Sequence, residues 1–407
     1  MDQNKVNING QFLDAGAHCV HSEFCGGCKY DQVPYEEQVK EKAQYVIEQL
    51  DSKGAKVEFV DDFVGCPENR RMQYRNKMEY TFGDFVKDGP LCLGMHKIRN
   101  FMSIVTVDQC LLVHSDFNEI LRYTLDFSVE RGYAHYHKRS HSGLLRNLIV
   151  RRGERTNQLM VNIVTSSDGE FDNEAWVKGL LALPLENQLV SVYHTYNDSL
   201  ADAVVPEKVQ LIYGQSYYED VIAGLKFKVG PFSFFQTNVP AAEKLYLDAI
   251  DLIEDVEGKR VFDLYCGTGT ISQIVARKAK AVLGIELVEE AALLAKESAA
   301  ENGLDNCQFI AGDVFKVLEE QSQIQKPDVI IVDPPRVGMS EKAVEKIASY
   351  GVDEILYISC NPKTMAMNLA QFRTLGYETK LVRGYDNFCR TKHVESVVLM
   401  SRVAPTK

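Results

Sequence analysis

From residue 258 onward, short apolar runs alternate regularly with longer segments of helical pattern. The apolar runs cover residues 260–265, 281–286, 307–312, 328–333 and 354–359. This alternation is typical of a parallel β-sheet that is covered by helices on both faces. The end of the chain differs, because residues 377–388 and 393–402 are strand-like runs without a helix between them. We therefore expect an α/β domain whose sheet closes with one antiparallel strand.

The part of the chain before residue 230 has a mixed pattern. It offers an amphipathic helix at residues 35–50 and short strand candidates at residues 148–153 and 158–165. A chain of 407 residues is too long for one compact core. We therefore expect two domains, a mixed α+β domain at residues 1–230 and the α/β domain at residues 231–407.

Composition and charge restrict where the protein works and what it binds. No run of 18 apolar residues is present, and the N-terminus lacks the basic region and apolar core of a signal peptide. A cytoplasmic location without a membrane partner is therefore expected. The formal net charge of −12, taken alone, argues against a nucleic-acid partner.

The expected strands end in residues that suit a nucleoside, because ligands of such sheets bind beyond the carboxyl ends of the strands. In DLYCGTGTIS (263–272), Gly267 and Gly269 allow a tight turn close to a ligand. Ser272 replaces the third glycine of the dinucleotide pattern, which favours a nucleoside. Glu286 ends the second strand, where it can accept ribose hydroxyls, and Asp313 follows the third, within reach of an adenine. Helix N-capping is the alternative role of either acid.

The segments DLYCGTGT, GIE, AGD and VDPPR, in this order, resemble class I S-adenosylmethionine-dependent methyltransferases over residues 230–405. The resemblance implies a Rossmann-like fold for this part of the chain. In VDPPR (332–336), Asp333 ends the fourth strand and two prolines stiffen the loop beside the methyl donor. Amine methyltransferases of this class tend to carry an aromatic residue after the prolines. Arg336 stands there instead, which argues against an amine acceptor.

A cysteine ends the fifth expected strand. In LYISCNPKT (356–364), Pro362 cannot extend a central strand, so Cys360 lies at its carboxyl end. A thiolate beside a methyl donor can add to C6 of uracil, so that C5 attacks the methyl group. A base must then remove the proton from C5. Glu395 in TKHVES (391–396) is the candidate base, and His393 competes with it. A small buried apolar side chain is the alternative role for Cys360.

The segments SCNPKT, HVES and GPFSFFQTN (230–238) together resemble the RNA uracil-C5 methyltransferases, which make 5-methyluridine in ribosomal or transfer RNA. The resemblance implies that Cys360 is the nucleophile and Glu395 the base. It also implies that S-adenosylmethionine contacts Gln236, Tyr265, Thr270, Glu286, Asp313 and Asp333. DNA cytosine-C5 enzymes place their cysteine after a proline. No such motif stands at these strand ends, so DNA is not expected as a partner.

Three cysteines near the N-terminus, Cys19, Cys25 and Cys28, follow the spacing C-x5-C-x2-C. A fourth thiolate would complete a zinc or an iron–sulfur site. Cys110 is our choice, with Cys66 and Cys92 as alternatives, and spacing alone does not separate the two kinds of site. Many RNA uracil-C5 methyltransferases carry a [4Fe–4S] cluster on C-x5-C-G-G-C and one distant cysteine. The resemblance therefore implies such a cluster, with a structural role.

Two segments offer RNA contacts in this acidic chain. Residues 68–80 and 135–155 interleave arginines and lysines with aromatic residues, which suits phosphate contact and base stacking. A solvated charged face is the alternative interpretation of each segment. The small N-terminal β-barrel RNA-binding domain of many family members is expected to be missing, because only 18 residues precede Cys19.

The expected protein thus combines a class I S-adenosylmethionine-dependent methyltransferase domain with an N-terminal α+β iron–sulfur and RNA-binding domain. It would methylate C5 of a uridine in 23S ribosomal RNA, and transfer RNA is the alternative substrate. The target uridine must leave its stack to reach Cys360. A rival hypothesis is an inactive iron–sulfur RNA-binding protein, and an amine methyltransferase is a second.

Overall fold

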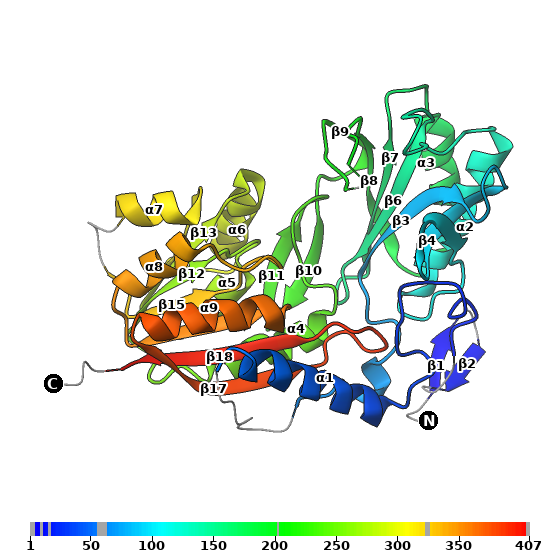
Figure 1. Ribbon diagram of the computed structural model, residues 1–407. Helices are drawn as coiled ribbons and strands as arrows, with labels where there is room; N and C mark the ends of the chain where they lie inside the picture. Colours follow the sequence, from blue (N-terminus) through cyan, green and yellow to red (C-terminus); the bar gives the residue numbers. More distant parts are fainter. Residues whose placement is uncertain are drawn as a thin grey trace. The chain divides into compact units, whose positions relative to one another are not determined.

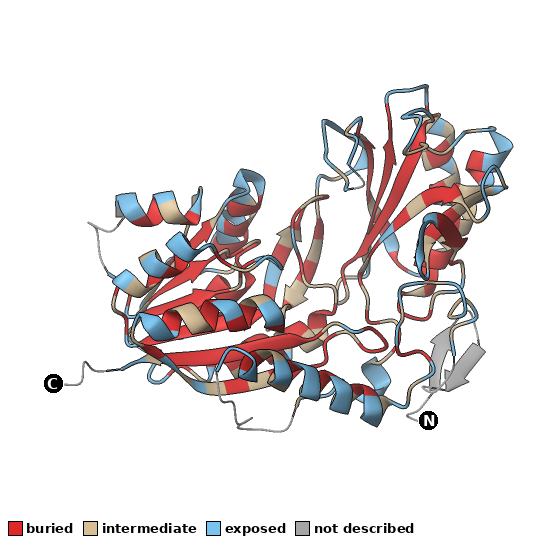
Figure 2. Ribbon diagram, viewed as in Figure 1, coloured by how far each residue is buried: buried red, intermediate tan, exposed pale blue. Residues whose placement is uncertain are grey.

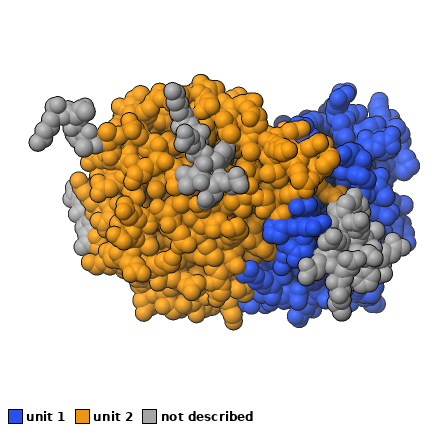
Figure 3. Space-filling model, turned by 90° about the horizontal axis from the view of Figure 1, so that it is seen from below, with its two compact units in different colours: residues 1–32, 67–220 blue, residues 33–66, 221–407 orange. Residues whose placement is uncertain are grey.

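The computed structural model describes residues 5–8, 11–14, 18–54, 63–201, 203–321 and 326–403 (Figure 1). Its internal contacts divide the chain into two units, and neither is a single stretch of sequence (Figure 3). Unit 1 consists of residues 1–32 and 67–220, and unit 2 consists of residues 33–66 and 221–407. The division expected at residue 230 differs from these units in two places, because residues 33–66 and 221–230 belong to unit 2.

Unit 2 contains a seven-stranded sheet in the order β14-β13-β12-β15-β16-β18-β17. Its strands are β12 (Arg260–Leu264), β13 (Ala281–Glu286), β14 (Cys307–Ala311), β15 (Val329–Val332), β16 (Glu354–Ser359), β17 (Tyr377–Tyr385) and β18 (Glu395–Arg402). β18 runs antiparallel to both of its neighbours, whereas the pairs from β14 to β16 are parallel. The predicted parallel sheet with one antiparallel closing strand is therefore confirmed.

Helices cover both faces of this sheet, which explains why its central strands are apolar at successive positions. α4 (Val239–Ile250), α5 (Thr270–Ala276) and α6 (Glu289–Glu301) lie on one face (Figure 1). The other face packs against α1 (Tyr35–Asp51), α7 (Val314–Gln321), α8 (Glu341–Ser349) and α9 (Pro362–Thr374). Figure 2 shows the resulting buried strands between helices whose outer faces are exposed. Pro362 begins α9 immediately after β16, as its fixed backbone favours at a first helical position.

Residues 33–66 join unit 2 because α1 holds the loop between β17 and β18. The Lys42 ammonium, which is 1% exposed, lies 2.6 Å from Asp386 Oδ1 and donates to the Phe388 carbonyl at 3.1 Å. The Arg390 amide donates to Gln38 Oε1 at 3.0 Å. A lone buried charge would be costly, so both ionic partners are needed together. Helix α1 thereby fixes the loop that leads into Glu395.

Unit 1 contains a second seven-stranded sheet in the order β5-β4-β3-β6-β7-β8-β9. Its strands are β3 (Lys77–Asp84), β4 (Leu91–Lys97), β5 (Asn100–Thr106), β6 (Leu145–Arg152), β7 (Gln158–Thr165), β8 (Gln188–Tyr196) and β9 (Lys208–Gly214). The sheet is antiparallel except for the pair β7–β8, which is connected through α3 (Asn173–Ala182). α2 (Ser115–Glu130) and α3 share its core through Phe117, Leu121, Trp176 and Leu180. The predicted α+β character of the N-terminal part is confirmed.

The remaining elements are short. β1 (Lys5–Ile8) and β2 (Gln11–Asp14) form a hairpin, η1 spans Glu68–Arg70, and β10 (Tyr218–Ile222) pairs with β11 (Leu225–Val229). β11 packs against α6. Within the described ranges, every helix is too short or too polar to cross a membrane.

Candidate active site and cysteine cluster

Cys360 and Glu395 come from neighbouring strands at one end of the unit 2 sheet. The antiparallel pairing of β16 with β18 ends with Ser359 opposite Ser396. Cys360 follows Ser359 and Glu395 precedes Ser396, so the register sets the two functional residues opposite each other. Glu395 is buried at 5% exposure, and Cys360 is half-buried. Directly opposed residues on one face of a sheet interact, which places an acid beside the thiol.

Arg336, from the loop after β15, is the third member of this group. Its side chain donates a hydrogen bond to the Cys360 sulfur. Its carbonyl accepts hydrogen bonds from Asn361 Nδ2 at 2.8 Å and Thr364 Oγ1 at 3.2 Å. The Asn361 side chain also caps α9, by accepting from the Lys363 amide at 3.2 Å. The SCNPKT segment therefore anchors the VDPPR loop, and Arg336 is held against the thiol.

The ionisable side chains of this site change one another's pKa values. Burial and then the Glu395 carboxylate raise the pKa of Cys360, while the hydrogen bond from Arg336 lowers it, and the net result is a pKa of about 11. Burial also raises the pKa of Glu395 well above its usual range, with a further rise from Asp333 and an opposing effect of Arg336. Burial, followed by the charge of Asp263, raises the pKa of Asp333 to about 7. A cation bound among these carboxyl groups would favour their ionised forms.

Glu286 is fixed at the carboxyl end of β13. Its Oε2 accepts from the Gly267 amide at 2.9 Å, and its Oε1 accepts from the Val288 amide at 2.9 Å. Each carboxylate oxygen can accept more than one hydrogen bond, so the half-buried carboxylate keeps acceptor capacity for ligand hydroxyls. Gly267 has φ of +56°, which a glycine adopts without strain. The glycine turn of DLYCGTGT is thus tied to the acid of the next strand.

Tyr265 and Asp313 lie together at the same end of the sheet. Tyr265 is half-buried and has φ of +67°, an uncommon conformation for a tyrosine, at the end of β12. Burial raises the pKa of Tyr265 to about 12, and the nearby Asp313 carboxylate contributes to the rise. Asp313 is exposed, and its Oδ1 accepts from the Lys316 amide at 3.1 Å. The N-capping that was the alternative role for Asp313 is therefore present, beside the tyrosine.

Gln236 and Thr270 have different surroundings. Gln236 Nε2 donates to the Tyr246 hydroxyl at 2.7 Å, and the pKa of Tyr246 is raised by burial and then by Asp333 and Glu395. Gln236 is therefore connected to the acidic group through one tyrosine. Thr270 begins α5, is buried, and lies 3.2 Å from the Thr268 hydroxyl.

Three residues join the site that the sequence did not single out for a role. In the sequence, Arg336 stands out only because it replaces the aromatic residue of amine methyltransferases. Its position as a cation directly after the two prolines could have indicated a role in the site. Asp263 is fully buried, and its Oδ2 accepts from the Ser272 hydroxyl at 2.5 Å. Its position as an acid inside the apolar run RVFDLY could have indicated a role in the site. Tyr246 had no signal, because a tyrosine in an amphipathic helix is an ordinary core residue.

The cysteine loop of unit 1 is fastened to the β4–β5 hairpin. Cys25 forms a β-bridge with Lys97, the Gly26 amide donates to the His96 carbonyl at 3.0 Å, and the Ile98 amide donates to the Phe24 carbonyl at 2.8 Å. A Cβ atom at Gly26 would stand only 3.0 Å from that His96 carbonyl oxygen. The glycine therefore permits the close approach of the loop to the hairpin.

The four predicted cluster cysteines interact electrostatically. Burial raises the pKa of the Cys28 thiol, and Cys110, Cys25 and Cys19 raise it further, in this order. Burial raises the pKa of Cys110 to about 12, with contributions from Cys19 and Cys25. Of the two alternative fourth cysteines, Cys66 interacts with Cys389 inside unit 2, and the Cys92 thiol faces the Pro90 carbonyl at 3.6 Å.

The sulfurs are not arranged around a single point. In the parts of the chain that the structure describes, no three His, Cys, Asp or Glu side chains stand as ligands of one metal ion. In an iron–sulfur cluster the cysteines ligate separate irons, so their sulfurs lie further apart than around one zinc ion. The four thiols thus interact electrostatically without forming a single-ion site among the described residues.

Many side chains of the two basic segments are buried or make contacts inside unit 1. In the first segment, Tyr74 and Tyr80 are 3% and 0% exposed, so neither ring offers a stacking surface for a base. In the second, Arg146 is buried and donates to the carbonyls of Asn197, Ser199 and Ala201.

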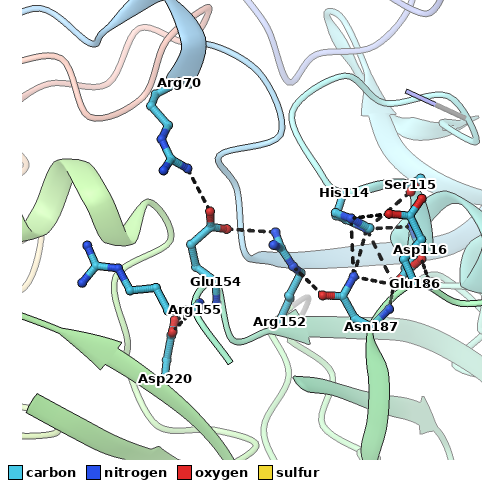
Figure 4. Close-up of polar contacts among 10 residues, drawn as sticks. All are labelled: Arg70, His114, Ser115, Asp116, Arg152, Glu154, Arg155, Glu186, Asn187 and Asp220. Carbon is cyan, nitrogen blue, oxygen red and sulfur yellow. Dashed lines mark hydrogen bonds and ion pairs between the residues drawn. The ribbon is translucent and has the colours of Figure 1, made fainter. Parts of the chain in front are cut away.

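Figure 4 shows that Arg152 and Arg70 also make polar contacts with residues of unit 1. Arg152 donates to Asn187 at 3.1 Å and to Glu154 at 2.8 Å, and Glu154 also binds Arg70 at 3.1 Å. The Asn187 side chain in turn donates to Asp116 at 2.7 Å. The expected RNA contacts are therefore wrong for the buried residues Tyr74, Tyr80, Arg146 and Arg152, whereas Arg70 is exposed. Residues 135–139, at the start of the second segment, remain partly or fully accessible.

Comparisons with known proteins agree with this arrangement. A family model described as tRNA (Uracil-5-)-methyltransferase matches residues 208–403. An uncharacterized RNA methyltransferase of Clostridium acetobutylicum is 44% identical over 98% of this chain and 86% of its own length. One of Caldanaerobacter subterraneus is 43% identical over 94% of this chain and 84% of its own length.

Among solved structures, the tRNA (uracil-54, C5)-methyltransferase of Pyrococcus abyssi in complex with S-adenosyl-L-homocysteine covers 97% of this chain, and 90% of its own chain is matched. The TM-score is 0.74 and the sequence identity 23%, so this likeness supports the fold. The two relatives and the matched family model identify the chain as a member of the RNA uracil-C5 methyltransferase family.

Proposed function

We propose that the protein methylates C5 of a uridine in 23S ribosomal RNA through a covalent bond between Cys360 and C6 of the base. The observation that carries the proposal is the pairing of β16 with β18, which sets Cys360 opposite Glu395. Uracil C5 is a weak nucleophile, and a thiolate with an adjacent base is the combination that its methylation needs. The matched family and the Pyrococcus enzyme are both named for tRNA, so transfer RNA is the alternative substrate.

The Cys360 thiolate starts the reaction by forming an S–C6 bond, which moves the electron pair of the C5–C6 double bond to C5. S-adenosylmethionine supplies an electrophilic methyl group, which C5 accepts. The Glu395 carboxylate then takes the proton from C5, and the electrons of the C–H bond restore the double bond as the S–C6 bond breaks. The products are 5-methyluridine and S-adenosylhomocysteine, and the thiolate is regenerated.

Arg336 stabilises the thiolate in this scheme. The half-buried Cys360 thiol has a pKa of about 11 with the Arg336 hydrogen bond in place, so only a small fraction is thiolate at neutral pH. The guanidinium hydrogen bond favours the charged form, and the neighbouring Glu395 carboxylate opposes it. A protonated Glu395 would remove this opposition before the thiolate adds. The raised pKa of Glu395 fits this order of events. The acid is protonated when the thiolate adds, and it must lose that proton before it acts as the base.

The residues at the strand ends fit S-adenosylmethionine. Glu286, with acceptor capacity left on a fixed carboxylate, would bind the ribose hydroxyls. Tyr265 and Asp313 would lie beside the adenine, and Gln236 and Asp333 near the charged end of the ligand. Asp263 Oδ1 is buried, and no described residue hydrogen bonds to it. The carboxyl groups of Asp263 and Asp333, whose pKa values burial raises, suit a sulfonium ion. Thr270 is assigned only by the family resemblance.

We also propose that Cys19, Cys25, Cys28 and Cys110 bind a [4Fe–4S] cluster. Their mutual electrostatic effects and the attachment of the loop to the β4–β5 hairpin support this assignment. The cluster would hold the loop in place, since no step of the reaction needs an electron. RNA and S-adenosylmethionine are both cytoplasmic reactants, which supports the cytoplasmic location expected from the sequence.

The test is nucleoside analysis after incubation of anaerobically purified protein with unmodified ribosomal and transfer RNA and methyl-labelled S-adenosylmethionine. Label in 5-methyluridine of one RNA is the expected result, and it identifies the substrate class. Label in a different nucleoside would contradict the role of Cys360. Label in an amine would revive the amine methyltransferase hypothesis, and bound cofactor without any transfer would favour an inactive RNA-binding protein.

A further inference from the structure

A pocket of about 350 Å³ lies within unit 1, next to the edge of its sheet. Strands β3, β4 and β5 form one side of the pocket, and residues 135–139 form the other. Its volume falls in the range of small-ligand sites. The proposed catalytic group belongs to unit 2, so this pocket is made of different elements.

The lining carries the opposite charge from the chain as a whole. Lys87, Lys138 and Arg139 contribute cations, and Asp84 is the one acid among the described residues that line the pocket. No ion pair engages the exposed Arg139 within the described ranges. In a protein of net charge −12, a local group of this kind favours an anionic ligand.

Aromatic and apolar surface lies next to these cations. Phe101 on the β4–β5 hairpin is 75% exposed and Met102 is 46% exposed. The Phe101 ring packs only against the His96 ring, at 5.1 Å between centroids, among the ring contacts of the described residues. An exposed phenylalanine beside cations is the combination on which single-stranded nucleic acids stack their bases and place their phosphates.

His137 lines the pocket, and one of its two ring nitrogens already accepts hydrogen bonds. Its Nδ1 lies 3.3 Å from the Arg139 amide and 3.3 Å from the Ser140 amide, and it accepts from both. A neutral histidine whose Nδ1 accepts must carry its proton on Nε2. The Nε2 group is therefore a donor suited to a phosphate or to a carbonyl oxygen of a base.

The two sides of the pocket are held by backbone contacts. The β4–β5 hairpin is attached to the cysteine loop through Cys25, Gly26 and Ile98, as described above. On the other side, the Tyr136 amide donates to the Leu145 carbonyl at 2.7 Å. Gly143 has φ of +108°, and a Cβ atom there would stand 2.1 Å from the His135 carbonyl oxygen. The geometry of the pocket thus exists before a ligand arrives, which lowers the entropic cost of binding.

We propose that this pocket binds one nucleotide of a single-stranded RNA segment, with the base against Phe101 and the phosphate beside Arg139. The inference rests on the proposed function, because it supplies a second anchor for the RNA whose uridine is methylated. It also gives the cysteine cluster a purpose, since the loop that the cluster would hold is fastened to the hairpin that carries Phe101.

The test has two readouts that do not depend on methyl transfer. Wild-type protein is irradiated with ribosomal and transfer RNA that lack 5-methyluridine, and cross-linked peptides are mapped by mass spectrometry. Nucleotide adducts are expected on peptides that contain Phe101 or residues 135–139. Binding of a labelled fragment from the cross-linked RNA is then measured for Phe101→Ala and Arg139→Glu, and each should weaken binding about tenfold.

Matched controls separate the pocket from general effects of surface apolarity and charge. Val129→Ala removes another exposed apolar side chain of unit 1, and Lys178→Glu reverses another exposed charge; neither residue lines the pocket. Both should bind RNA as the wild type does, and all four variants should keep the wild-type melting temperature. Equal weakening by the control variants, or adducts confined to other peptides, would overturn the proposal.

The outcome is independent of the proposed reaction. If the wild type makes no 5-methyluridine but cross-links through the pocket, the nucleotide site stands and the proposed function fails. If the wild type makes 5-methyluridine while Phe101→Ala and Arg139→Glu bind RNA normally, the proposed function stands and the nucleotide site fails.

Discussion

The Arg336 side chain donates a hydrogen bond to the sulfur of Cys360, although the two residues follow different strands of the sheet. The same arginine is fixed through its carbonyl by Asn361 and Thr364, which come just after the cysteine. The proposed nucleophile and its cationic partner are therefore positioned by one set of contacts. The hydrogen bond lowers the pKa of a half-buried thiol that burial and Glu395 raise, and so favours the nucleophilic thiolate.

Arg336→Ala should make the Cys360 thiol less acidic, because the thiolate loses its charged hydrogen-bond donor. We expect methyl transfer at pH 7.5 to fall about tenfold or more, with partial recovery at higher pH. The alkylation rate of Cys360 by iodoacetamide, followed by peptide mass spectrometry, should show the same shift toward alkaline pH without any RNA. Val337→Ala, at an 82% exposed neighbouring position, is the control. An unchanged alkylation profile would remove Arg336 from thiolate stabilisation.

Binding of S-adenosylmethionine should weaken as the pH falls from 8 to 6. Burial raises the pKa of Asp333 and of Asp263 to about 7, so both carboxyl groups lose their charge over this range. The sulfonium ion depends on those charges, whereas the uncharged thioether of S-adenosylhomocysteine depends on them less. Calorimetric dissociation constants of the two ligands should therefore approach each other at low pH. A ratio that stays constant would place the acids away from the sulfonium.

Lys42→Met should destabilise unit 2, because it leaves Asp386 buried without its cation. The loss expected for breaking a buried ion pair is about 3–5 kcal/mol in the free energy of unfolding. Lys40→Met on the exposed side of α1 is the matched control and should have little effect. Urea unfolding measures both variants, and a double variant with Asp386→Asn should regain part of the loss. Equal stability of the two lysine variants would show that α1 does not hold the β17–β18 loop.

Cys110→Ser should lose most of the iron bound by anaerobically purified protein, because a [4Fe–4S] cluster needs four thiolates. Cys92→Ser should keep the wild-type iron content, since its thiol faces a carbonyl on its own hairpin. Iron analysis and the visible absorption spectrum measure both. Iron loss from Cys92→Ser but not from Cys110→Ser would exchange the two assignments. Zinc in place of iron in the wild type would refute the cluster.

The fold of unit 2 could be predicted because its signals are local. Apolar runs, glycine turns and Pro362 each determine the nearby backbone, and the alternation of strands with helices predicts a parallel sheet. The proposed roles of Cys360 and Glu395 came from strand ends, and the register of β16 with β18 brings those ends together. No such local rule exists for the pairing of Lys42 with Asp386, which are 344 residues apart. The membership of residues 33–66 in unit 2 was missed for that reason.

The basic segments show a different limit of sequence reasoning. Arginines and tyrosines in a row look available for RNA, but Tyr80 is a core residue of β3 and Arg146 is buried in β6. Burial of such residues depends on partners, and the partners of Arg146 are carbonyls about 50 residues further along the chain. The sequence gives no sign of these contacts. The short stretch at residues 135–139 remains accessible, since it joins the sheet only at the start of β6, through the bridge between His135 and Leu145.

The covalent step is the central claim, and trapping it is the most direct test. In Glu395→Gln the thiolate can still add to C6, but the amide cannot take the proton from C5, so the methylated nucleotide should stay attached to the protein. The variant is incubated with the substrate RNA and S-adenosylmethionine, digested with nuclease and protease, and analysed by mass spectrometry. We predict a 5-methyluridine adduct on the peptide that contains Cys360, and none in Cys360→Ala. Turnover by Cys360→Ala, or an adduct on another residue, would contradict the mechanism.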